Sequence, residues 1–253
     1  MPNIKDQIPY NEPLKILLIS ENGGGKSIAA DSFYKAGPIR VHEFDGRMAP
    51  VINHFAPMKA DISYDTFDSN NFRKYFDEME ELQNNCPYKT IVTDSITSLS
   101  TSCVLFSMKA AGKFKTGQDK LPATSFDEIN RETVWFTELL EASCKIIHRK
   151  FGVNIIWTAH PVAKTTIEDG TGSKISPIVS YGYKVPGIIP GYFNEIYSIQ
   201  QERVDLKTFK RTVYTVPHNN LPGKTAFPNL LPDSFDITNK SFYDVLMSYL
   251  NKK

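Results

Sequence analysis

A cluster of glycines followed by Lys and Ser has the residue types that bind the phosphates of a nucleotide. In the segment ENGGGKS, Gly23, Gly24 and Gly25 allow successive backbone N–H groups to point at phosphate oxygens. Lys26 can reach the β and γ oxygens, and the hydroxyl of Ser27 can bind Mg²⁺. The segment predicts a phosphate-binding loop (P-loop) for ATP and Mg²⁺, and the alternative is a glycine-rich turn with a surface lysine.

The loop departs from the usual pattern at its first position, where Ser20 replaces a glycine. Asn22 lies within the loop and is a further candidate for nucleotide binding. The flanking segments support the interpretation, because LKILLIS at 14–20 predicts a buried strand and SIAADSFYKAG at 27–37 has helical spacing. A glycine loop between a strand and a helix is the context in which this motif binds phosphate.

An aspartate at the end of a second apolar strand supplies the acid that a P-loop requires. The β-branched run TIVTDSITSL predicts a strand that leads into a polar turn, and Asp94 ends its apolar part. A carboxylate in this place holds the water shell of Mg²⁺ in nucleotide-binding enzymes. The alternative is that Asp94 only caps the helix that follows.

The elements that position these residues alternate between strand and helix. We predict further strands at 39–44 and 152–160, and helices from Asp68 to about 84, at about 98–110, at about 126–150 and at the C-terminus. EIYSIQQE and KRTVYTVP predict a hairpin around DLKTF. A looser stretch runs to roughly residue 66, and 111–125 and 163–191 are expected to be loops. The order predicts an α/β fold with a mainly parallel central sheet flanked by helices and a C-terminal β-hairpin.

The length and composition of the chain limit the possible domain organisation and class of protein. The 253 residues include 29 Lys and Arg against 28 Asp and Glu, which excludes a wholly basic protein that coats nucleic acid. We expect a polar leader at 1–13 and one domain at 14–253. Three widely separated cysteines, without metal-ligand spacing, predict reduced thiols. The sequence contains neither the apolar core of a signal peptide nor a membrane-spanning run, so we expect a cytoplasmic protein without a membrane partner.

The segments TIVTDSITSL and IIWTAH resemble the corresponding strands of RecA-type ATPases. The order of P-loop, long gap, DS-containing strand, helix and TAH strand resembles the compact RecA-like ATPases of bacteriophages, which are associated with single-strand annealing and recombination. The resemblance covers about residues 14–232, including GYFNEIYSI and HNNLPGK. It implies a RecA-like P-loop core, ATP and Mg²⁺ as ligands, and the host cytoplasm as the location.

The same resemblance implies roles for single residues. Lys26 and Ser27 would bind phosphate and Mg²⁺, and Asp94 would bind Mg²⁺ through water. His160 would sense the γ-phosphate or its attacking water, and Ser95 would orient Asp94. The alternative for His160 is a strand-end histidine with a backbone partner.

The resemblance to RecA-like enzymes also implies a general base just beyond the second strand, where this sequence has HEFDGRM. Glu43 and Asp45 share one strand face by their spacing of two, so either could approach the nucleotide. We favour Asp45, and Arg47 stands where a Glu would be expected. If neither carboxylate reaches the water, the protein would be an ATP-dependent binder with little turnover.

Lysines in the two long loops are candidates for contact with single-stranded DNA, which is bound by cationic groups together with aromatic side chains. RecA-like proteins direct these loops at the DNA channel, and the alternative is solvated surface lysines. The candidate DNA-binding residues are Lys113, Lys115, Lys120, Lys174 and Lys184.

RecA-like ATPases commonly bind nucleotide between subunits, so the resemblance implies a homo-oligomer. A cation from the neighbouring subunit would then neutralise charge on the phosphates, and the hairpin candidates for this trans role are Lys207, Lys210 and Arg211. The favoured function is an ATPase that acts on single-stranded DNA in recombination or annealing, with a single-strand-binding protein as a further candidate partner. The alternatives are a nucleotide-gated scaffold or loader and a small-molecule P-loop kinase.

Overall fold

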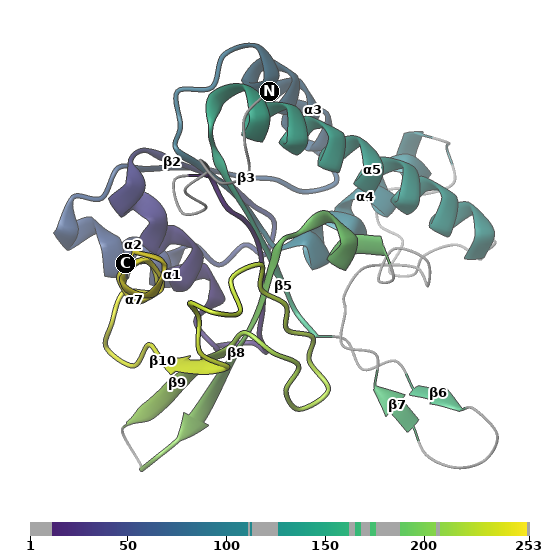
Figure 1. The fold of residues 1–253 in the computed structure, drawn as a ribbon. Helices are drawn as coiled ribbons and strands as arrows, with labels where there is room; N and C mark the ends of the chain where they lie inside the picture. Colours follow the sequence, from purple (N-terminus) through teal and green to yellow (C-terminus); the bar gives the residue numbers. More distant parts are fainter. Residues whose placement is uncertain are drawn as a thin grey trace, which may run out of the picture.

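The computed structural model describes residues 12–110, 112, 126–161, 165–167, 173–175, 188–205 and 208–251. Within these residues, a central sheet has eight strands in the order β10-β9-β8-β1-β5-β4-β2-β3. Helices cover both faces of this sheet (Figure 1). The predicted α/β fold is confirmed.

The sheet has a parallel centre and an antiparallel edge. The parallel strands are β1 (Lys15–Ile19), β2 (Ile39–Glu43), β3 (Ile62–Thr66), β4 (Thr90–Asp94), β5 (Asn154–Ala159) and β8 (Glu195–Arg203). The antiparallel strands are β9 (Phe209–Tyr214), which forms the predicted hairpin with β8, and β10 (Ser234–Asp236). Because β1 pairs with both β5 and β8, the loop that follows β1 opens at the middle of the carboxyl edge of the sheet.

Two groups of helices bury the two faces. One face packs against α3 (Phe72–Asn84), α4 (Ile96–Ala110) and α5 (Phe126–Phe151), and the other against α1 (Lys26–Asp31), α2 (Ala49–Phe55) and α7 (Phe242–Leu250) (Figure 1). Short 3₁₀ helices are η3 (Ser32–Ala36), η4 (Ala56–Met58) and η5 (Ile189–Tyr192). Alternate side chains of β1 show the division, because Leu17 packs with the α3–α5 core and Leu18 with the α1–α7 core.

Several predicted boundaries shift. The run at 90–99 is a strand only to Asp94, and α4 begins at Ile96 rather than at about Ser98. Helix α3 begins at Phe72 because the Asp68 carboxylate accepts the N–H groups of Asn70 and Asn71 in a turn that precedes the helix.

Two stretches expected to be irregular contain regular structure. The looser stretch after β2 holds α2, η4 and β3, where Pro50 lies in the first turn of α2 and therefore does not interrupt it. Strand β3 pairs only with β2 and is partly exposed, so it lacks the continuous apolar run of the central strands. The loop prediction for 163–191 was wrong at β6 (Thr165–Ile167) and β7 (Ser173–Ile175), which pair with each other, and at η5.

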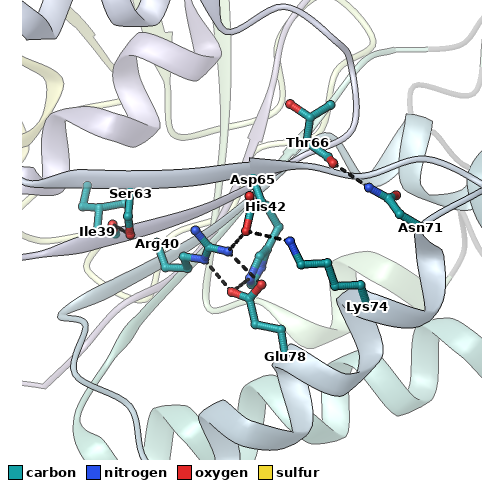
Figure 2. Close-up of polar contacts among 9 residues, drawn as sticks. All are labelled: Ile39, Arg40, His42, Ser63, Asp65, Thr66, Asn71, Lys74 and Glu78. Carbon is teal, nitrogen blue, oxygen red and sulfur yellow. Dashed lines mark hydrogen bonds and ion pairs between the residues drawn. The ribbon is translucent and has the colours of Figure 1, made fainter.

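A network of charged side chains ties β2 and β3 to α3 (Figure 2). The guanidinium of Arg40 donates to Glu78, with Nη2 2.7 Å from Oε2, and also to Asp65. His42 is fully buried, and its Nε2 lies 3.0 Å from Oε1 of Glu78. An ionised carboxylate only accepts hydrogen bonds, so Nε2 carries the proton of this imidazole. The network fixes β2, whose carboxyl end carries Glu43 and leads to Asp45.

The pKa of Glu78 reflects this environment. Burial raises the pKa, but the hydrogen bonds and charges of His42 and Arg40 outweigh burial and lower it to about 2. A depressed folded-state pKa stabilises the fold above the unfolded value of about 4.3. This contribution is lost as the pH falls from there toward 2.

Replacing Glu78 by Ala is expected to reduce the free energy of unfolding at pH 7 by about 3 kcal/mol, because it leaves Arg40 and His42 without their shared carboxylate. Chemical denaturation between pH 7 and pH 3 measures the effect, and the difference from wild type should shrink as the pH falls. The control is Glu81→Ala at an exposed position of the same helix. A loss below about 1 kcal/mol, or one independent of pH, would contradict the assignment.

Candidate functional site

The glycine loop joins β1 to α1 and requires glycine for two separate reasons. Gly23 and Gly25 have φ values of +80° and +92°, a conformation that favours glycine. A Cβ at Gly24 would lie 2.6 Å from the Oγ of Ser20. Ser20 is fully buried, and its hydroxyl donates to the carbonyl of Glu21. The missing side chain at Gly24 therefore makes room for the serine that replaces the usual first glycine.

Lys26 begins α1 with its side chain turned into the protein, and the residue is only 6% exposed. Burial lowers its pKa, while the charges of Asp94 and Asp45 act in the opposite direction. Its Nζ lies 3.1 Å from Nδ1 of His160. A desolvated ammonium beside a glycine loop fits a ligand with concentrated negative charge, such as a triphosphate.

Asp94 lies at the end of β4, next to the end of β5. Its carboxylate accepts the hydroxyl of Thr158, and its backbone carbonyl accepts the N–H of Phe44. Ser27 and Asp94 provide hydroxyl and carboxylate oxygens, the donor types that suit Mg²⁺. In the part of the chain that the structure describes, no group of three or more His, Cys, Asp and Glu side chains could hold a metal. With two such oxygen donors, Ser27 and Asp94 fit an ion that takes most of its ligands from phosphate and water.

Asp45 and His160 form a hydrogen-bonded pair beside Lys26. Oδ2 of Asp45 lies 2.8 Å from Nε2 of His160, and Oδ1 accepts the Ser95 hydroxyl at 2.8 Å. Burial raises the pKa of Asp45, but hydrogen bonds from His160, Ser98 and Ser95 outweigh burial and hold it well below its usual range. An ionised Asp45 accepts only, so Nε2 of His160 carries the proton and Nδ1 presents its lone pair to Lys26.

Glu43, the other predicted base, is buried at the end of β2. It is 1% exposed, and its Oε1 accepts the backbone N–H of Arg47 at 2.9 Å, which closes the turn after β2. Burial raises its pKa. Nη1 of Arg47 lies 3.2 Å from Oδ1 of Asn22, so the arginine that stands in place of the expected Glu contacts the phosphate-binding loop.

The structure thus brings together the glycine loop, Asp94, Asp45 and His160, which are far apart in the sequence. Ser95 contacts Asp45 rather than orienting the carboxylate of Asp94, whose partner is Thr158. Thr158, two residues before His160, was not predicted as a site residue. Its period-two relation to His160 along the strand was the only signal available.

The candidate DNA-binding residues mostly lie outside the described part of the chain. These are Lys113, Lys115, Lys120 and Lys184. Lys174 lies in β7, but its side chain is not described. Their role stays a prediction.

The three hairpin residues proposed to act in trans differ in position. Lys207 lies outside the described residues. Lys210 is exposed and pairs across the hairpin with Glu202. Arg211 lies against the glycine loop of its own chain, where a Cβ at Gly25 would be 3.2 Å from its Nε.

Two cavities border the glycine loop. A cavity of about 680 Å³ is lined by residues that include Asn22, Gly24, His160, Gln200, Gln201 and Asn219. A second cavity of about 480 Å³ is lined by residues that include Gly25, Ile28, Tyr34, Phe55, Arg211 and Lys240. Volumes of this size are typical of small-ligand sites.

A family model described as an AAA domain matches residues 12–227, which include every element from β1 to β9. A search of curated proteins found no match. None of the helices in the described ranges has the length and apolar character needed to cross a bilayer.

Proposed function

Because the chain belongs to the AAA-domain family of P-loop NTPases, we propose that it binds ATP with Mg²⁺ and hydrolyses the γ-phosphate. The observation that carries this proposal is the contact of the buried Lys26 ammonium with the His160–Asp45 pair at the mouth of the glycine loop. A cation, an acceptor for a proton and a phosphate cradle then lie within one site.

The residues of the site have separate roles in the proposed hydrolysis. The backbone of Gly23–Ser27 and the ammonium of Lys26 bind the phosphates. Ser27, and Asp94 through water, would hold Mg²⁺, which would neutralise charge on the phosphate oxygens. When Lys26 turns to the phosphates, Nδ1 of His160 is released from its present partner.

The proton acceptor follows from the hydrogen bonds. Both oxygens of Asp45 accept hydrogen bonds from Ser95 and His160, whereas Nδ1 of His160 becomes free to accept a proton once Lys26 turns from it to the phosphates. We therefore assign the proton of the attacking water to Nδ1 of His160. Water oxygen bonds to the γ-phosphorus, the bond to the β-phosphate oxygen breaks, and the ionised Asp45 stabilises the imidazolium. Asp45 is then the positioning residue behind His160.

The proposal extends to single-stranded DNA as the partner and to a homo-oligomer that acts in recombination or annealing. Its support is the resemblance of the motif order to compact RecA-like ATPases and the lysines of the 111–125 and 163–191 segments. The near-neutral overall charge means that a DNA contact has to be local.

Single-stranded DNA is expected to increase ATP turnover, because a DNA-bound state that favours the active assembly raises the population of competent sites. Phosphate release is measured with and without an oligonucleotide at low salt, and the stimulation should fall as salt rises. Double-stranded DNA serves as the matched ligand control. Turnover that is indifferent to both would contradict the DNA role.

Two further outcomes point to the alternative functions. ATP binding and nucleotide-dependent assembly without turnover would favour a nucleotide-gated scaffold or loader. Transfer of the γ-phosphate to a nucleoside monophosphate rather than to water would favour a P-loop kinase.

A further inference from the structure

Arg211 is positioned by the sheet of its own chain. Its backbone N–H donates to the hydroxyl of Thr238 at 2.8 Å, and its carbonyl accepts the N–H of Ile237. From this fixed point on β9 the side chain extends to the glycine loop, where a Cβ at Gly25 would lie 3.2 Å from Nε and 3.6 Å from Cζ. A Cβ at Gly25 would lie closer to the guanidinium than most contacts of this kind, so the guanidinium would have to move slightly.

The guanidinium of Arg211 is oriented by a neutral side chain and not by a carboxylate. Its Nε donates to Oε1 of Gln201 at 3.0 Å, and Gln201 lies directly opposite on β8. The neighbouring cross-strand pair, Glu202 and Lys210, combines opposite charges, whereas Arg211 faces a neutral amide. Within the described residues no carboxylate forms an ion pair with Arg211, and its two Nη groups have no partner.

This arrangement connects the guanidinium to both cavities at the loop. Gln201 lines the cavity that contains His160, and Arg211 itself lines the cavity that contains Gly25 and Ile28. An arginine that is oriented through Nε keeps the planar pair of Nη donors, which matches the geometry of phosphate oxygens.

We propose that Arg211 binds the phosphate chain of the ATP held by its own subunit, so that the cation acts in cis. The inference rests on the proposed ATP binding and specifies a further residue of that site. It replaces the expectation that Arg211 reaches into a neighbour, because the side chain already lies beside the glycine loop of its own chain.

The first test measures binding of a non-hydrolysable ATP analogue with Mg²⁺ to wild type, Arg211→Ala and Arg211→Gln. We expect both variants to bind about 10- to 100-fold more weakly, the range for a lost charge-assisted hydrogen bond. The control is Arg149→Ala on the exposed side of α5. Melting temperatures without nucleotide show whether each variant is folded, and Arg211→Gln retains most of the side chain if Arg211→Ala is not.

The second test distinguishes cis from trans. Arg211→Ala is co-expressed with Lys26→Ala, so that mixed assemblies form. In a cis arrangement each chain lacks one part of its own site, and turnover stays at the level of the single variants. In a trans arrangement a Lys26→Ala chain would supply Arg211 to its neighbour, and turnover of the mixture would rise above both.

The outcomes separate the two proposals. If wild type fails to bind the analogue, ATP binding itself is refuted and this inference with it. If wild type binds and the Arg211 variants bind equally well, or if the mixture recovers turnover, only the role of Arg211 in cis is overturned.

Discussion

Replacing Lys26 by Ala is expected to reduce ATP turnover by about 10²- to 10³-fold, the usual cost of removing one donor that stabilises charge in the transition state. The ammonium is buried at the mouth of the glycine loop, where a desolvated charge acts strongly on phosphate oxygens. Its removal also takes away the partner of His160 Nδ1, but leaves the Asp45–His160 pair intact. Phosphate release by wild type and variant at the same ATP concentration is the measurement.

The effect should not arise from unfolding. Burial already lowers the pKa of Lys26, so the folded protein bears a desolvation cost for this charge. We expect the melting temperature without nucleotide to be unchanged or slightly higher in Lys26→Ala. ATP with Mg²⁺ should raise the melting temperature of wild type but not that of the variant. The matched control is Lys145→Ala on the exposed side of α5, and wild-type turnover by Lys26→Ala would refute the site.

Local sequence patterns were sufficient to predict the parts of the site that are formed by neighbouring residues in the chain. The glycine loop could be recognised because strand, loop and helix follow in sequence, and Asp94 because it ends an apolar run. The role of Ser20 could not be seen this way. A serine fits at this position because Gly24 has no side chain next to the Ser20 hydroxyl. This proximity is set by the path of the loop and not by the residue types.

The choice between Glu43 and Asp45 shows where sequence reasoning stopped. A spacing of two places both on one strand face, but β2 ends at Glu43 and Asp45 lies in the turn beyond it. The turn is closed by Glu43 through the Arg47 N–H, and Asp45 within this turn contacts His160, 115 positions further along the chain. Such long-range contacts depend on the strand order, which periodicity does not specify.

The basic residues of the β8–β9 hairpin show that the sequence also cannot predict which cation lies near the site. The pattern of lysines and arginine indicated cations on β9, and alternation along the strand separates Lys210 from Arg211. Only the pairing of β9 with β8, and of β8 with β1, shows that Arg211 faces the loop that follows β1.

Asp45→Asn is expected to lower turnover by about 10²- to 10⁴-fold while nucleotide binding stays near that of wild type. The ionised carboxylate fixes the proton of His160 on Nε2 and leaves Nδ1 as an acceptor. An asparagine amide can donate to Nε2, which moves the proton to Nδ1 and removes the acceptor for the proton of water. It also removes the charge that stabilises the imidazolium.

The comparison with Glu43→Gln and Asp61→Asn makes this result specific. Asp61 is exposed, and its substitution should leave turnover unchanged. Glu43→Gln should act mainly on stability, since its carboxylate closes a turn through Arg47. Turnover and binding of the ATP analogue are measured for all three variants. If Glu43→Gln abolishes turnover with binding intact while Asp45→Asn remains active, Glu43 is the base. The pKa of Asp45 lies well below its usual range, so wild type should not lose turnover through this carboxylate as the pH falls to about 5.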